Sequence, residues 1–214
     1  MKQRVVLSKS SRILWDGSAL KDARFVLFAL SSLLGFLAIY IPFYYTQQWA
    51  RDQLDVAPDL AFYSVSIMNA GSVAGRLVQL QLASYTGAMT GILFSSIISA
   101  VVCYCWIAVK STTGLIIFTL FYGYSSGAWL ALNPVVIANI TPRADLIGTR
   151  MGMAFMIMAP AALIGNPVAG VLLGHHRPNY LHLQLFAAVA MTAAAGGMAV
   201  VLILQRLQTK TWKV

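Results

Sequence analysis

The chain has 214 residues, of which 59% are hydrophobic and only 10% are charged, and its formal net charge is +9. A soluble helical domain keeps a charged outer face at the helical period, so this composition excludes that class. A soluble nucleic-acid-binding protein is also excluded, because the basic residues lie between long apolar stretches. The composition indicates an α-helical protein that crosses a membrane several times.

Six apolar stretches follow one another along the chain, separated by polar connectors. A helix of about 20 apolar residues crosses the hydrocarbon core of a bilayer, and each stretch reaches that length. The stretches cover residues 24–45, 60–82, 88–109, 113–137, 150–173 and 184–205. They predict an all-α membrane protein with six transmembrane helices.

The basic residues predict how these helices are oriented. Most of the 15 lysines and arginines fall on the side of the two termini, whereas Arg51, Lys110 and Arg177 fall on the other side. Cytoplasmic loops carry an excess of Lys and Arg, so both termini are expected in the cytoplasm. The expected organisation is a basic cytoplasmic tail or loop at 1–23, a six-helix transmembrane bundle at 24–205 and a cytoplasmic tail at 206–214.

A proline lies near the end of the first and of the fourth predicted helix. Pro42 stands in Tyr40-Ile41-Pro42-Phe43, and Pro134 stands in Leu132-Asn133-Pro134-Val135. These helices begin two triplets that cross the membrane in opposite directions. Broken helices at matching positions of inverted repeats are typical of transporters, so Pro42 and Pro134 are expected to act as hinges.

Glycines recur at four-residue spacing, and such pairs let membrane helices approach closely. Simple close packing is the more frequent role of one pair, and the alternative is that the thin helix faces slide against each other. The pairs are Gly71/Gly75, Gly123/Gly127, Gly148/Gly152 and Gly170/Gly174.

Arg76 is the most informative single residue, because a charge inside an apolar stretch is costly unless it faces a cavity or a partner. The alternative is that its long side chain extends to the lipid headgroups. Asn69 and Ser72 precede it by seven and four residues and so lie on the same helix face. This polar stripe predicts the wall of a hydrated path for an anionic substrate.

Residues suited to catalysis are missing from the sequence. The chain has no glutamate, and it has no nucleophile–base set and no glycine-rich phosphate loop. His175, His176 and His182 could bind a metal, but solvated loop residues are the simpler interpretation. We therefore expect no catalytic residue, no cofactor and no metal, and we do not expect an enzyme.

Aromatic residues gather towards the end of the first predicted helix. An aromatic belt at the membrane–water interface is the simpler explanation for them. The alternative is that they line a substrate entrance. They are Tyr40, Phe43, Tyr44, Tyr45 and Trp49.

Several motifs, taken together and in order, resemble one family. They are Asn69-x-x-Ser72-x-x-Gly75-Arg76 with the following Leu82–Gly87, then Tyr122–Gly127, Ile147–Gly152 and Leu163–Gly170. The chain thereby resembles the C-terminal half of the major facilitator superfamily, and more narrowly its fungal monocarboxylate-transporter-like branch. The resemblance covers about residues 20–205 and implies one six-helix bundle of a twelve-helix transporter fold.

The resemblance also implies a function for Arg76, since the matching arginine of the family contacts the substrate carboxylate. Ser72 stands where the family often has an acidic residue, and Ser84 and Tyr85 stand where it has a charged cytoplasmic gate. The implied activity is transport of a small organic anion, a monocarboxylate or a secondary metabolite. By analogy, the plasma membrane is the expected location.

Two alternatives concern the whole molecule. The first is a transporter or half-transporter completed by a second six-helix bundle, from a homodimer or a partner half. The second is a truncated, non-transporting remnant or an accessory membrane subunit. Alternating access requires two bundles that rock against each other, so one bundle alone is not expected to transport. The expected partners are the lipid bilayer and a small-molecule substrate, and no nucleic acid.

Overall fold

The computed structural model describes residues 15–174 and 178–209, and this part of the chain is helical and contains no strand. Two short 3-10 turns, Ala19–Lys21 (η1) and Ala144–Leu146 (η2), precede the first and sixth long helices. The helices are α1 (Ala23–Ile39), α2 (Ile41–Leu54), α3 (Pro58–Thr86), α4 (Ala88–Ala108), α5 (Thr112–Ile140), α6 (Ile147–Leu173) and α7 (Tyr180–Thr209).

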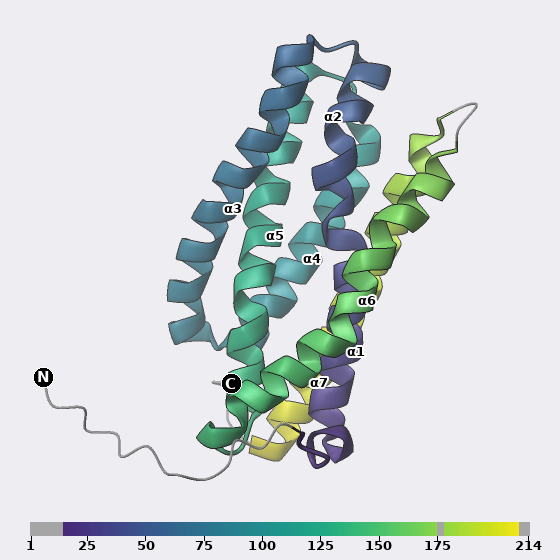
Figure 1. Ribbon diagram of the computed structural model, residues 1–214. Coiled ribbons are helices and arrows are strands. Elements are labelled where there is room, and N and C mark those ends of the chain that lie inside the picture. The colour runs from purple at the N-terminus through teal and green to yellow at the C-terminus, as the bar shows by residue number, and fades with distance from the viewer. Residues whose placement is uncertain (1–14, 175–177, 210–214) are drawn as a thin grey trace, which may run out of the picture.

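The helices run up and down in one bundle (Figure 1). α1 and α2 form a bent rod along it, and each later helix reverses the direction of the one before. The start of α1 and the end of α7 therefore lie at one end, which we call the terminal end. The α2–α3 and α4–α5 connections lie at the opposite end, which we call the far end.

Five described segments are long and apolar enough to cross a membrane. They are Ala23–Leu54, Ala88–Ala108, Thr112–Ile140, Ala144–Leu173 and Tyr180–Leu207. These segments confirm the prediction of an all-α membrane protein. The predicted stretch 60–82 lies in α3, which has 29 residues but is not among the five.

Two predicted connectors are shorter than expected because the helices before them are longer. α2 continues to Leu54 and α3 to Thr86, past the predicted ends at residues 45 and 82. Asp55 ends α2 with a φ of 49°, and Gly87 separates α3 from α4 with a φ of 90°, a conformation that glycine adopts without strain. Hydrophobicity identified the apolar part of these two helices and missed their more polar last turns.

The two predicted hinge prolines occupy different local structures. Pro42 lies in the first turn of α2, directly after the interruption at Tyr40 that separates α2 from α1. Pro134 lies inside α5, which continues as one helix to Ile140. There the Asn133 side chain donates to the carbonyl of Trp129 at 3.0 Å. This bond ends on Trp129, whereas the carbonyl that Pro134 leaves without an N–H partner is that of Leu130.

Glycines bring α3 and α5 into backbone contact. A Cβ atom on Gly75 would overlap the carbonyl of Tyr124, and one on Gly123 would overlap that of Met68. Gly148 and Gly152 of α6 face open space instead, with nothing within 4 Å of an added Cβ. Glycine pairs with the same four-residue spacing thus have different surroundings. Those of α3 and α5 lie in a close helix contact, and Gly148 and Gly152 of α6 lie on an open face.

Candidate functional site

A cavity of about 320 Å³ lies between α2, α3 and α5, and we call it the Arg76 cavity. Ligand pockets for small molecules begin at roughly this size. The cavity brings together all three residues that were predicted to line a substrate path. Its lining residues are Tyr40, Phe43, Tyr44, Val65, Asn69, Ser72, Arg76 and Leu130.

One face of α3 supplies the polar side of the Arg76 cavity. Val65, Asn69, Ser72 and Arg76 are four or three residues apart, so successive turns of the helix present them to the same side. Ser72 is only 4% exposed, because its backbone packs against Gly127 of α5. Arg76 is exposed and lies ten residues before the end of α3, about 15 Å along the helix.

The electrostatics of the Arg76 cavity favour an anion. Among the described residues Arg76 makes no ion pair, and no carboxylate lines the cavity. One amide hydrogen of Asn69 donates to the Val65 carbonyl at 3.0 Å, which fixes this side chain along the helix. The unpaired guanidinium can therefore bind a carboxylate through two parallel hydrogen bonds.

The aromatic residues at the end of the first predicted helix divide between the cavity and the core. Tyr40, Phe43 and Tyr44 form the wall opposite the polar face of α3, whereas Trp49 is buried against Trp106 with ring centroids 5.7 Å apart. Tyr45 donates to the carbonyl of Asn166 in α6 at 3.0 Å. Three of the five residues thus line the cavity, and the other two pack or bond within the bundle.

The predicted hinges and the histidines lie differently. Pro42 stands between two cavity-lining residues, Tyr40 and Phe43, whereas Pro134 lies outside the lining. His182 is exposed near the start of α7, and His175 and His176 fall outside the described residues. Within the described ranges, no group of three potential metal ligands comes together.

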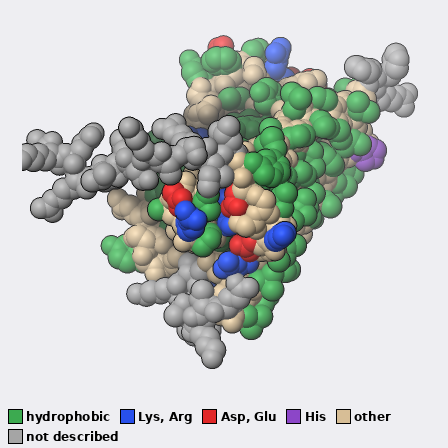
Figure 2. All heavy atoms as spheres, turned by 60° about the horizontal axis from the view of Figure 1, so that its bottom comes forward, with side chains coloured by type: hydrophobic (Ala, Val, Ile, Leu, Met, Phe, Trp, Pro, Cys, Tyr) green, Lys and Arg blue, Asp and Glu red, His purple; other side chains and the backbone are tan. Residues whose placement is uncertain are grey.

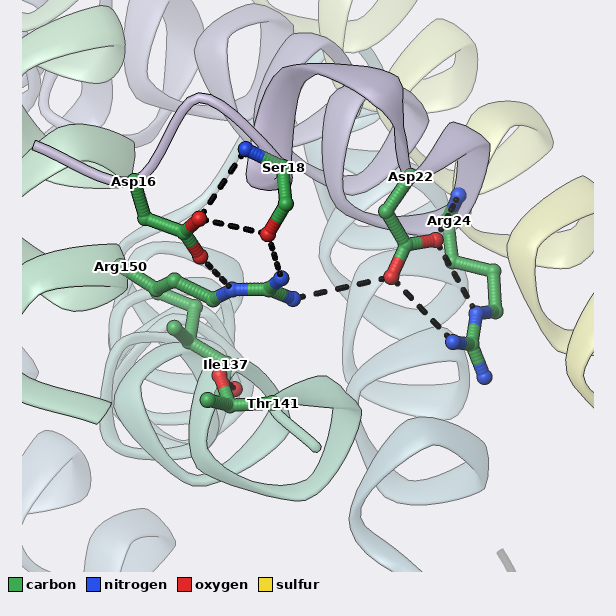
Figure 3. Close-up of polar contacts among 7 residues, drawn as sticks. All are labelled: Asp16, Ser18, Asp22, Arg24, Ile137, Thr141 and Arg150. Atoms are coloured by element: carbon green, nitrogen blue, oxygen red, sulfur yellow. Dashed lines mark hydrogen bonds and ion pairs between the residues drawn. The ribbon is translucent and has the colours of Figure 1, made fainter. Parts of the chain in front are cut away.

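A second polar site lies at the terminal end and was missed by the sequence analysis. Figure 2 shows that Lys, Arg and Asp side chains gather at this end, while hydrophobic side chains cover the adjacent flank. The centre of the site is Arg150 at the start of α6, which is only 3% exposed. Asp16, Ser18, Asp22 and Arg150 together are called the Arg150 cluster (Figure 3).

Short contacts hold the Arg150 cluster together. The guanidinium of Arg150 donates from Nε to Asp16 at 2.8 Å and from Nη2 to the Ser18 hydroxyl at 3.2 Å. Its Nη1 lies 3.6 Å from Asp22, and Cζ lies 5.9 Å from the centre of the Phe25 ring. Asp22 also accepts the backbone N–H of Arg24 as the N-cap of α1. The cluster thus fastens the segment before α1 to the first turn of α6.

Hydrogen bonding sets the charge state of the cluster. The hydroxyl of Ser18 donates to Asp16 at 2.5 Å. This hydrogen bond, and then the one from the Arg150 guanidinium, hold the pKa of Asp16 below its usual value in spite of burial. Asp16 is therefore ionised at neutral pH and keeps its ion pair with Arg150.

The sequence analysis singled out neither Arg150 nor Ser18 as a member of a polar site. Ser18 precedes η1, but its hydroxyl makes no cap hydrogen bond and bonds within the cluster instead. The residues that pair, Asp16 and Arg150, are 134 positions apart. Two acids before the first apolar stretch, Asp16 and Asp22, and a base at the start of the fifth were the available signals.

Comparison with known proteins gives consistent relatives. No family model matches the chain. The aspyridones efflux protein of Emericella nidulans is 35% identical over 155 residues, which is 72% of this chain and 31% of that protein. An MFS-type transporter of the same fungus is 32% identical over 91% of this chain and 44% of its own length. The agnestins efflux protein of Paecilomyces divaricatus is 31% identical over 92% of this chain and 43% of its own length.

The chain spans less than half of the length of each of these relatives. In two of them, however, the similarity covers more than nine-tenths of this chain and so includes the Arg76 cavity. Five apolar helices agree with the membrane location that transport requires. The chain is therefore an integral, multi-pass membrane protein whose relatives are MFS-type transporters.

Proposed function

We propose that the chain forms one bundle of an MFS-type transporter for a small organic anion, such as a monocarboxylate or an anionic secondary metabolite. The observation that carries this proposal is the Arg76 cavity, where a guanidinium that makes no ion pair with the described residues shares the lining with three aromatic residues. The rings suit the apolar body of such a compound, and the guanidinium suits its acidic group. Two of the relatives are named as efflux proteins for metabolites, which supports this substrate class.

The proposal includes six membrane crossings and the C-terminal half of the fold, in its monocarboxylate-transporter-like branch. α3 would be the remaining crossing, since it has 29 residues and lies parallel to the apolar helix α5, against which it packs. Its polar face would be tolerated because it lines a cavity. Pro42 and Pro134 keep their proposed function as hinges of α2 and α5.

A second six-helix bundle would complete the path. The open face of α6 at Gly148 and Gly152 leaves room for another helix, unlike the filled contact between α3 and α5. Substrate would then lie between two bundles that rock against each other. This partner is either a second copy of the chain or a different half of a transporter.

Orientation and location are part of the same proposal. Among the described residues, Lys21, Arg24, Arg143, Arg150 and Arg206 lie towards the terminal end, whereas Arg51 and Lys110 lie at the far end. The excess of positive charge supports a cytoplasmic terminal end. We propose the plasma membrane as the location, by analogy with export of small molecules.

The test uses radiolabelled benzoate as the probe and the purified chain in lipid nanodiscs. Binding by the unchanged protein and its loss in Arg76→Ala, with partial recovery in Arg76→Lys, are the expected results. Arg143→Ala is the matched control, because Arg143 is exposed and pairs only with Asp145 nearby. Equal binding by Arg76→Ala and the unchanged protein would remove the cavity from the proposal.

The alternative of a non-transporting remnant or accessory subunit is tested by measuring the flux of benzoate across a membrane. Vesicles that contain the chain are loaded with unlabelled benzoate, and the entry of labelled benzoate is followed. Binding with exchange across the membrane supports a transporter, which requires that the chain pairs with another bundle. Binding without exchange, even after co-reconstitution of two differently tagged copies, supports the non-transporting alternative.

A further inference from the structure

The junction between α1 and α2 leaves backbone groups that need partners. The last carbonyl groups of a helix have no partner within that helix, and Pro42 lacks the N–H that would reach the carbonyl of Ala38. The N–H of Tyr40 donates to Ala38 instead. The carbonyl of Ile39, the last residue of α1, therefore needs a donor from elsewhere in this apolar part of the bundle.

Tyr122 of α5 supplies that donor. Its hydroxyl donates to the Ile39 carbonyl at 2.9 Å, and the side chain is fully buried. The two residues are 83 positions apart in the sequence, so only the folded bundle makes this contact. Because the bond ends on the residue beside the interruption, it holds the bend between α1 and α2 in one position.

The ring of Tyr122 connects the same junction to the cavity wall. It packs edge-on against Phe43 with centroids 6.0 Å apart, and it stacks on Phe118 at 5.8 Å. Phe43 lines the Arg76 cavity, and Tyr40, the residue at the interruption, lines it too. One side chain thus contacts both the backbone and a ring of the aromatic wall, although it does not line the cavity itself.

We propose that Tyr122 is a positioning residue that sets the distance between the aromatic wall on α2 and the guanidinium of Arg76 on α3. This inference rests on the proposed function, since it determines which anions fit the Arg76 cavity. The spacing between ring and acidic group in a bound compound must match the spacing between the wall and Arg76. Without the Tyr122 hydroxyl, the junction between α1 and α2 can move. The aromatic wall then no longer favours compounds with one particular distance between ring and acidic group.

The variant Tyr122→Phe removes the hydroxyl and keeps the ring contacts with Phe43 and Phe118. The matched control is Tyr124→Phe on the same helix, because the Tyr124 hydroxyl makes no hydrogen bond within the described part of the chain. Thermal unfolding in detergent confirms that both variants are folded. Hydrogen–deuterium exchange of the peptide that covers Ile39–Phe43 then measures how firmly the junction is held.

The expected result is exchange about fivefold faster at the junction in Tyr122→Phe, the factor for loss of one ordinary hydrogen bond. Tyr124→Phe is expected to exchange like the unchanged protein. Binding in nanodiscs is measured for benzoate, phenylacetate and 3-phenylpropanoate, in which the ring and the carboxylate move apart by one methylene each time. The ratio of their dissociation constants is expected to change at least about threefold in Tyr122→Phe only.

Two results would overturn the inference. Unchanged exchange in Tyr122→Phe would show that the hydroxyl does not hold the junction. Faster exchange with unchanged ratios would show that the junction does not set the spacing of the cavity. Failure of the proposed function is a separate result: none of the three probes would then bind the unchanged protein, while the exchange data would still decide whether Tyr122 holds the junction.

Discussion

Arg76 and Arg150 both lie on long helices, but their surroundings are opposite. Arg76 is exposed, faces a cavity and makes no ion pair within the described chain, whereas Arg150 is buried and bonds to Asp16 and Ser18. A charge without a partner is available for a ligand, and a charge that is already paired with a buried carboxylate serves the structure. The comparison teaches that the depth of an arginine in an apolar stretch does not decide its function, and that its partners do.

The largest expected effect is on stability and comes from Arg150. Arg150→Ala would leave the buried Asp16 without its cation, whereas Asp22 keeps its ion pair with Arg24. Breaking a buried pair such as Asp16–Arg150 costs about 3–5 kcal/mol. The free energy of unfolding, measured by denaturant titration in detergent micelles, should fall by about this amount. Arg143→Ala removes an exposed pair and should change it by less than about 1 kcal/mol. Equal losses of unfolding free energy in Arg150→Ala and Arg143→Ala would contradict a structural role for the buried Arg150.

The stability of the contact between α3 and α5 should depend on close backbone packing rather than on Arg76. Gly123→Ala places a methyl group on the Met68 carbonyl, and such overpacking costs about 1–3 kcal/mol. Gly148→Ala faces open space and is the control. The same titration should show a loss for Gly123→Ala only. A loss of similar size for Gly148→Ala in a preparation of single bundles would contradict the open face of α6.

The pH dependence of the Arg150 cluster gives a smaller effect. The folded pKa of Asp16 is lower than its ordinary value of 3.8 in an unfolded chain. Its contribution to stability is therefore complete above pH 3.8 and is lost as the pH falls through the lower folded value. The difference in unfolding midpoint between the unchanged protein and Asp16→Asn should stay constant at neutral pH and shrink below 3.8. A difference that instead grows towards low pH would contradict the assigned ion pair.

The smallest expected effect on stability is that of Arg76→Ala. Since Arg76 is exposed and unpaired within the described residues, its removal should change the free energy of unfolding by no more than about 0.5 kcal/mol. Benzoate binding, by contrast, should weaken by about 10- to 100-fold, the usual worth of a charged hydrogen bond. A large loss of stability without a loss of binding would assign Arg76 to structure and reverse the comparison.

The local pattern of the sequence was enough to find the polar side of α3 that lines the Arg76 cavity. Asn69, Ser72 and Arg76 lie within one helix, and the helical period alone brings them to one face. The aromatic wall needed more than the period, because Tyr40 and Phe43 belong to another helix whose bend decides where they point. The bend lies at Tyr40, just before Pro42, whereas α5 continues as one helix through Pro134.

The sequence by itself determined the membrane class, the helical architecture and the polar face of α3, since these depend on composition and on residues a few positions apart. The packing of the helices, by contrast, was needed to show that Asp16 pairs with Arg150, that Tyr122 reaches Ile39 and that the α3 glycines meet the backbone of α5. Each of these contacts joins residues from different helices. Their formation depends on how the helices pack, and hydrophobic periodicity along one helix carries no information about its neighbour.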